Sequence, residues 1–196
     1  MSEPINPDRA VFAYFHSGVG LAASFADEYA KHFHEKIGLI PCADGGTKLE
    51  QWMPGELLFD HAVMQARLAQ RTSEIGGILW HQGESDSGSE ESRNLYHDRF
   101  VRMIASLKAA LSLPDDIPLI VGGLGDFVKA YKGGSCIYVD DINAVLKGFC
   151  GEIGNCGFAS AEGLPCKYDG IHFTSAAYRE FGIRYFETYR KIRERM

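Results

Sequence analysis

Asp169 and His172 lie three residues apart in the segment DGIHFT, and both are of the types that acid–base catalysis uses. Across a tight turn, a carboxylate at this spacing can accept the Nδ1 proton of the imidazole. The Nε2 atom then remains as a general base for a hydroxyl nucleophile. The pair therefore predicts two members of a Ser-His-Asp triad. The alternative is a solvent-exposed histidine near the start of the last helix, for which Thr174 is a suitable N-cap.

Such a reaction also needs hydrogen-bond donors for a negatively charged oxygen, and two further loops contain them. In the segment WHQGESD, strand alternation places Trp80 and Gln82 on one face and His81 on the other. The amide of Gln82 is then available as a donor. Gly45 and Gly46, in the segment ADGGT, follow an apolar run and leave their backbone N–H groups open to close approach. An ordinary turn at these glycines is the alternative.

Three other side chains in or beside these loops have candidate roles. Glu84 and Asp86 cannot donate a hydrogen bond when ionised, so we expect them to order the loop or to bind substrate hydroxyls. A solvated loop is the alternative. Trp52 follows polar residues and precedes a Pro-Gly turn. Its ring is a candidate platform for stacking on a sugar, and core packing is the alternative.

These loops follow apolar runs of strand length and precede segments with helical periodicity. The predicted strands are Ile37–Cys42, Gly76–His81, Ile117–Gly123 and Asn155–Ser160. The predicted helices that follow them are Leu57–Thr72, Glu90–Leu113, Ser135–Gly151 and Thr174–Arg195. Ligands of open parallel sheets bind beyond the carboxyl ends of the strands, so we expect the polar loops to meet at one end of the sheet.

The alternation of strand and helix predicts the fold class. It indicates one α/β domain over residues 1–196, a three-layer α/β/α sandwich with a parallel, doubly wound sheet. A helix-like segment, Ser24–Lys36, precedes the first clear strand, although doubly wound domains usually open with a strand. Either Ala10–Phe15 is the opening strand, or that strand lies upstream of Met1.

Composition limits the classes of partner. The formal net charge of −6 argues against a nucleic-acid partner, and a small or neutral substrate fits better. No apolar window is long enough to cross a membrane, and the start of the chain lacks the pattern of a signal peptide. We therefore expect a cytoplasmic protein with no membrane partner. The five cysteines have no metal-binding spacing and are expected to be free, mostly buried thiols.

The segments IGLIPCADGGTKLEQW, GGILWHQGESD and DGIHFTSAAYREFG together resemble the sialate O-acetylesterase and acetylxylan esterase branch of the SGNH hydrolases. The resemblance runs from near Gly18 to the end of the chain. It implies a flavodoxin-like α/β/α fold that uses Ser, His and Asp, without metal or cofactor, to remove acetyl groups from carbohydrates. The implied partner is a small acetylated carbohydrate.

Matching positions carry the family roles to individual residues. The resemblance implies that His172 is the general base and that Asp169 orients it. It also implies that Gly45 and Gln82 contribute to the oxyanion hole, with Glu84 part of the same signature.

One block of the family pattern has no counterpart in this sequence. The family begins with a strand that ends in a G-Q-S-N motif, whose serine is the nucleophile, and no such motif is present. An N-terminally truncated reading frame explains the absence, in which case Ser17 and Ser24 are not catalytic. Alternatively, the segment AVFAYFHSG occupies the vacant position and Ser17 is the nucleophile.

Two rival functions follow from other features. The segment GVGLAA, Gly18 to Ala23, has the G-x-G-x-x-A form of a dinucleotide fingerprint, with Asp44 near the place of a ribose-binding acid. This interpretation leaves Gln82, Asp169 and His172 without a role. A catalytically inactive carbohydrate-binding remnant, which keeps the pocket without a serine, is the other alternative.

Overall fold

Three parallel strands form the centre of the protein in the computed structural model, which describes residues 19–196. The strands are β1 (Ile78–Trp80), β2 (Leu119–Gly122) and β3 (Cys156–Ala159). They pair in the order β1-β2-β3, with Trp80 beside Val121 and Gly122 beside Ala159. The strands are apolar because helices cover both faces of a parallel sheet.

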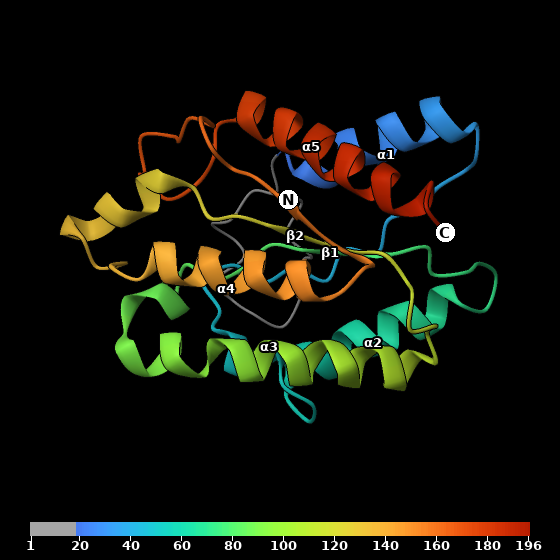
Figure 1. Cartoon of the computed structure of the whole chain (residues 1–196), viewed down its shortest axis with the longest axis horizontal. Helices are drawn as coiled ribbons and strands as arrows, with labels where there is room; N and C mark the ends of the chain where they lie inside the picture. Colours follow the sequence, from blue (N-terminus) through green and yellow to red (C-terminus); the bar gives the residue numbers. More distant parts are fainter. Residues whose placement is uncertain (1–18) are drawn as a thin grey trace, which may run out of the picture.

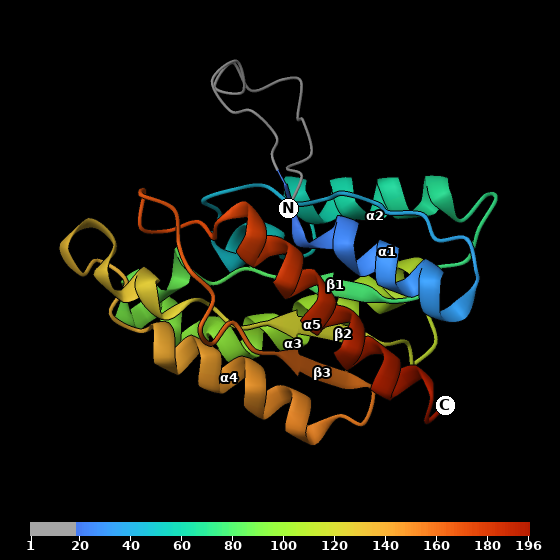
Figure 2. The ribbon, with the colours of Figure 1, turned by 90° about the horizontal axis from the view of Figure 1, so that it is seen from above.

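Five α-helices make the two outer layers (Figure 1). They are α1 (Leu21–Phe33), α2 (Leu57–Ala69), α3 (Glu90–Leu111), α4 (Val139–Glu152) and α5 (Ser175–Arg193). Helices α1 and α5 lie side by side on one face of the sheet, and α2, α3 and α4 lie on the other (Figures 1 and 2). The predicted three-layer α/β/α class is therefore confirmed.

Alternating side chains of the strands divide the core into two parts. Leu119 and Val121 belong to the cluster under α2, α3 and α4, whereas Ile120 belongs to the cluster under α1 and α5. The buried hydroxyl of Tyr185, on α5, donates a 2.7 Å hydrogen bond to the carbonyl of Trp80. This bond fixes α5 against the end of β1, where the polar loops begin.

The observed elements agree with the predicted ones in three of four strands and in every helix, with one clear exception. Ile37–Cys42, predicted as a strand, pairs with no strand of the described sheet. Leu39 and Ile40 are 45% and 37% exposed, so this apolar run is not buried as a sheet strand would be. The predicted opening strand, Ala10–Phe15, lies outside the described residues.

Helix boundaries shift by a few residues for local reasons. Helix α1 begins at Leu21 and ends at Phe33, because His34 adopts a left-handed conformation and its N–H caps the carbonyl of Ala30. Helix α4 begins at Val139 and not at Ser135, because a 3₁₀ segment, Asp126–Gly133, precedes it. Thr174 caps α5 as expected, since its side chain accepts the N–H of Ala177.

The expectation of five free thiols was wrong for one pair. Cys150, near the end of α4, and Cys156, the first residue of β3, form a disulfide across a short connection. Their Cα atoms lie 4.6 Å apart, within the usual range. Cys136 is buried, and Cys42 and Cys166 are half-buried free thiols. In residues 19–196, no helix is long and apolar enough to cross a membrane.

Candidate active site

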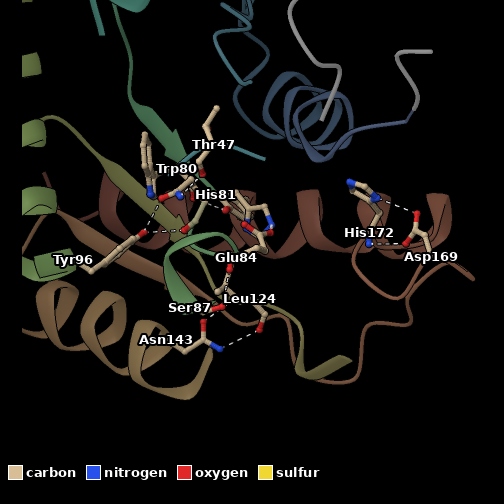
Figure 3. A network of polar contacts seen from close by, with 12 residues as sticks. Thr47, Trp80, His81, Glu84, Ser87, Tyr96, Leu124, Asn143, Asp169 and His172 are labelled. Atoms are coloured by element: carbon tan, nitrogen blue, oxygen red, sulfur yellow. Dashed lines mark hydrogen bonds and ion pairs between the residues drawn. The ribbon is translucent and has the colours of Figure 1, made fainter. Parts of the chain in front are cut away.

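Asp169 and His172 form the ion pair that their spacing predicts. The Nδ1 atom of His172 lies 3.0 Å from Oδ2 of Asp169, and the two side chains are 51% and 33% exposed. The Nε2 edge of the ring therefore points away from the carboxylate, as Figure 3 shows. An imidazole held by its Nδ1 atom and open at Nε2 has the geometry of a general base.

The loop that carries this pair is closed by backbone hydrogen bonds. The N–H of Lys167 bonds to the carbonyl of His172 at 2.7 Å, and the N–H of Thr174 bonds to the carbonyl of Pro165 at 3.0 Å. Gly170 turns the chain with a φ of +73°, a conformation that favours glycine. The next residue after His172, Phe173, is buried. The dyad thus stands on a fixed turn anchored in the core.

The carboxylate of Asp169 is strongly stabilised in its ionised form. Partial burial opposes ionisation, but the backbone N–H groups of His172 and Ile171 both donate to Oδ1, and the His172 ring contacts Oδ2. Together these contacts lower the pKa of Asp169 to about 2. Asp169 is therefore an anion at any pH well above 2, as an orienting partner must be.

Gln82 connects the two loops that were expected to form an oxyanion hole. Its amide donates one hydrogen bond to the carbonyl of Thr47 at 2.9 Å and another to Oδ2 of Asp86 at 2.6 Å. The hydroxyl of Tyr96 donates to the backbone carbonyl of Gln82 at 2.8 Å. Gln82 is buried and both amide hydrogens are engaged, so in this arrangement none is left for an oxyanion. Its observed contacts are those of a brace between the loops.

The buried side chain of Asp86 holds the loop after β1 and the segment at Leu49 together. Its side chain is fully buried, and Oδ2 also accepts the N–H of Leu49 at 2.9 Å. Burial raises the pKa of Asp86, while the hydrogen bonds from Gln82 and Leu49 act in the opposite direction. Of the two expected roles, loop ordering fits the structure, because a buried carboxylate cannot reach a substrate hydroxyl.

The glycine turn presents donors that remain available. Gly45 and Gly46 are exposed, and within residues 19–196 their N–H groups meet no hydrogen-bond acceptor. The Ser85 hydroxyl donates to the carbonyl of Gly46 at 3.1 Å, and the Thr47 hydroxyl donates to the carbonyl of Asp44 at 2.9 Å. The turn is therefore tied to the Gln82 loop through the carbonyl of Gly46, and its N–H groups are left without an acceptor among the described residues.

Glu84 pairs with the histidine that lies on the opposite face of β1 from Gln82. Nε2 of His81 lies 3.6 Å from Oε1 of Glu84, and the Glu84 side chain is 26% exposed (Figure 3). The His81 ring packs on Phe173 and Phe181. Burial lowers the pKa of His81, although Glu84 partly offsets this effect. The predicted alternation of side chains after β1 is thus confirmed.

Gly83 lies between Gln82 and Glu84, at a position where a side chain does not fit. Its φ is +147°, and a Cβ atom would come within 2.7 Å of Cγ2 of Ile142 and 3.3 Å of Cδ1 of Leu124. We expect Gly83→Ala to lower the free energy of unfolding by about 2–4 kcal/mol, measured by chemical denaturation.

Gly148, inside α4, provides the control for this substitution. A Cβ atom there meets nothing within 4 Å. Gly148→Ala is therefore expected to be neutral or to stabilise by up to ~1 kcal/mol. Equal stability of the Gly83→Ala and wild-type proteins would show that the steric constraint at Gly83 is absent.

Trp52 is not the sugar platform that its surroundings suggested. It is only 7% exposed, its ring packs edge to face on Trp80 with centroids 5.6 Å apart, and its Nε1 donates to the Thr47 hydroxyl at 3.0 Å. The exposed ring near the site belongs instead to Tyr168, directly before Asp169, whose exposure is 104%. The sequence contained no signal that distinguished these two aromatic residues.

No serine or threonine hydroxyl within residues 19–196 is hydrogen-bonded to His172 as a nucleophile would be. The Ser24 hydroxyl bonds to the carbonyl of Leu21 on its own helix, and Ser17 lies outside the described residues. The same part of the chain contains no cluster of three or more His, Cys, Asp or Glu side chains that could hold a metal ion.

An α/β/α fold with an Asp-supported histidine in the loop after β3, and a glycine turn with open N–H groups tied to the loop after β1, has the framework of a hydrolase site. Residues 1–191 match the family described as carbohydrate esterase, sialic acid-specific acetylesterase. The chain belongs to this family. Family membership leaves the dinucleotide-binding alternative, with its fingerprint at GVGLAA and its acid at Asp44, without support.

Individual relatives agree with this assignment. A protein named "Probable carbohydrate esterase At4g34215", from Arabidopsis thaliana, is 31% identical over 176 residues, which make up 88% of this chain and 64% of that protein. The chain thus spans less than two thirds of the relative's length. The X-ray structure of the same Arabidopsis protein matches with a TM-score of 0.80 at 30% identity, covering 91% of this chain and 71% of that chain.

Two more distant structures share the fold. XAC1771, described as a novel carbohydrate acetylesterase from Xanthomonas citri, matches with a TM-score of 0.66 at 19% identity, covering 90% of this chain and 41% of that one. NanS matches with a TM-score of 0.68 at 17% identity, covering all of this chain and 78% of that one. At these identities the similarity shows the fold alone.

Proposed function

We propose that the protein is a carbohydrate O-acetyl esterase that works by a Ser-His-Asp mechanism. The observation that carries this proposal is the His172–Asp169 pair, 3.0 Å apart on a closed loop after β3. Family membership supports the hydrolysis of carbohydrate esters. The proposed substrates are acetyl esters on sugars, such as acetylated xylan or O-acetylated sialic acid.

The proposed reaction assigns one step to each group. Nε2 of His172 takes the proton of a serine hydroxyl as the serine oxygen attacks the acetyl carbonyl carbon. The Gly45 N–H donates to the resulting oxyanion. His172 then gives its proton to the departing sugar oxygen, which leaves an acetyl-enzyme. Water, activated by His172, releases acetate and regenerates the serine hydroxyl.

Gln82 acts in this scheme as a positioning residue. Its hydrogen bonds to the Thr47 carbonyl and to Asp86 hold the glycine turn at the end of β1. We assign the serine to a segment outside residues 19–196, because no hydroxyl of that range contacts His172. Glu84 is partly exposed and lies 3.6 Å from His81, and we expect it to accept a hydrogen bond from a sugar hydroxyl.

Acetate release tests the proposal directly. Purified protein is incubated with acetylated xylan, O-acetylated sialic acid and an activated acetate ester, and free acetate is measured. Hydrolysis of at least one sugar ester supports the proposal. Release from the activated ester alone would leave the carbohydrate assignment unsupported.

A catalytically inactive carbohydrate-binding protein is the second candidate. It is favoured by one observation, that His172 contacts no hydroxyl among residues 19–196. It predicts binding of the acetylated sugar, measured by calorimetry, with no release of acetate from any ester.

Tyr168 is the aromatic residue that we expect to contact the sugar. Its ring is fully exposed while its backbone lies in the closed turn that carries Asp169. Tyr168→Ala should raise KM for an acetylated sugar about 3–10-fold, because one stacking contact is lost, and kcat should change much less. Steady-state kinetics measure the effect, and Tyr168→Trp should restore it. An unchanged KM in Tyr168→Ala would exclude a stacking role.

A further inference from the structure

Helix α2 carries an exposed apolar stripe on the face opposite to its buried one. The buried face consists of Leu58, Phe59, Val63 and Ala66, which pack into the core. On the outer face, Leu57, Met64 and Leu68 are 69%, 57% and 59% exposed. Figure 2 shows α2 at the periphery of the molecule. Aligned exposed apolar side chains of this size mark an interaction surface more often than isolated ones do.

The spacing of the stripe is that of a helix-pairing seam. Leu57, His61, Met64 and Leu68 follow one another at intervals of four, three and four residues, the a and d positions of a heptad repeat. His61 is half-buried and contacts Gln65 at 3.2 Å. This spacing keeps all four side chains on one line along the helix, where a second helix can pack against them.

Charges beside the stripe indicate which helix would pack there. Asp60 and Arg67 are both exposed and lie on the same flank of the stripe, seven residues apart. In an antiparallel pair of α2 helices, Leu57 of one copy meets Leu68 of the other, and His61 meets Met64. The flanks of the two helices then face each other, and Asp60 of each copy lies within one helical turn of Arg67 of the other copy. A parallel pair brings no such opposite charges together.

We propose that the outer face of α2 is a self-association surface, on which a second copy of this chain packs its own α2 in an antiparallel, two-fold symmetric arrangement. The same patch serves both copies, as a two-fold interface requires. Two helices of 13 residues bury less area than a standard interface of ~1,600 Å². The dimer is therefore weak, with a Kd on the order of 10–100 μM.

Sedimentation equilibrium over protein concentrations from ~1 to ~500 μM tests the proposal. The wild type should show a reversible monomer–dimer equilibrium, and Met64→Lys should raise the Kd at least ~10-fold. Val101→Lys, at a 40% exposed apolar position on α3, is the control and should leave the Kd within about 2-fold of wild type. A wild type that stays monomeric at all concentrations, or a Kd that Met64→Lys leaves unchanged, would overturn the proposal.

Charge reversal tests the antiparallel arrangement separately. Asp60→Lys alone should raise the Kd about 3–10-fold, and adding Arg67→Glu should restore it. Arg67 also donates a hydrogen bond to the carbonyl of Ala110 at 2.9 Å, and the double variant loses this bond. If the double variant regains association, the gain therefore comes from the reversed charge pair and not from the Arg67–Ala110 bond. A double variant weaker than Asp60→Lys alone would contradict the antiparallel pairing.

Discussion

Replacing His172 with alanine is expected to lower kcat/KM for acetyl ester hydrolysis by about 10³-fold or more. The imidazole is the group that takes and returns the proton, and alanine can do neither. His172 is half exposed, and the loop is closed by backbone hydrogen bonds, so the variant should keep the stability of the wild type. Initial rates with an activated acetate ester, together with a thermal melt, measure both effects.

A second His–Asp pair in the same chain provides a matched control. His97 and Asp98, at the surface of α3, have the same imidazole–carboxylate separation, 3.0 Å from Nδ1 to Oδ1, and the His97 side chain is 49% exposed. His97→Ala removes an equivalent pair on the exposed face of α3 and should change kcat/KM by less than about 2-fold. A fall of less than tenfold in His172→Ala would show that His172 is not the general base.

Asp169→Asn is expected to lower kcat by about 10²–10⁴-fold while the fold is retained. Asparagine can still accept the backbone N–H groups of Ile171 and His172, which now donate to Oδ1. It lacks the negative charge that stabilises the imidazolium, and its amide can favour the wrong tautomer of the ring. Rates over a range of pH, compared with those of Asp98→Asn, measure this contribution.

The pH dependence separates Asp169 from other groups. Its pKa of about 2 lies below the ordinary value of 3.8, so the carboxylate remains ionised down to about pH 3. Its contribution to stability is present above pH 3.8 and is lost as the pH falls towards 2. A decline in wild-type activity above pH 4 must therefore come from another group. If Asp169→Asn alone removed that decline, the assigned pKa would be wrong.

Local patterns were sufficient to predict most of the fold. Runs such as Ile117–Gly123 are apolar on both faces and are followed by helical periodicity, which is the signature of a covered parallel strand. The segment Ile37–Cys42 has the same composition but pairs with no described strand. Composition indicates that a segment can enter a sheet, whereas pairing depends on a neighbour that lies elsewhere in the chain.

The candidate site was predictable where its geometry is local. Asp169 and His172 are three residues apart, so their contact follows from a single turn. The engagement of the Gln82 amide was not predictable, because it depends on Thr47, which lies 35 residues away, and on a carboxylate buried beneath the loop. The sequence alone does not show whether the side chain of Asp86 is buried or exposed.

Burial also explains the two other differences from expectation. Trp52 and Tyr168 both follow polar residues, yet one is in the core and the other is in solvent. The Cys150–Cys156 disulfide joins the end of a helix to the start of a strand, and six residues of separation form no recognised motif. In each case the deciding neighbours come from other elements of the fold.

Labelling with a fluorophosphonate probe, which traps activated serines, tests the central claim most directly. The 196-residue chain and its His172→Ala variant are labelled in parallel, and the adduct is located by peptide mass. We predict a single labelled serine, outside residues 19–196, that is lost in the His172→Ala variant. No adduct in either protein, or an adduct that forms equally without His172, would contradict a serine esterase with His172 as its base.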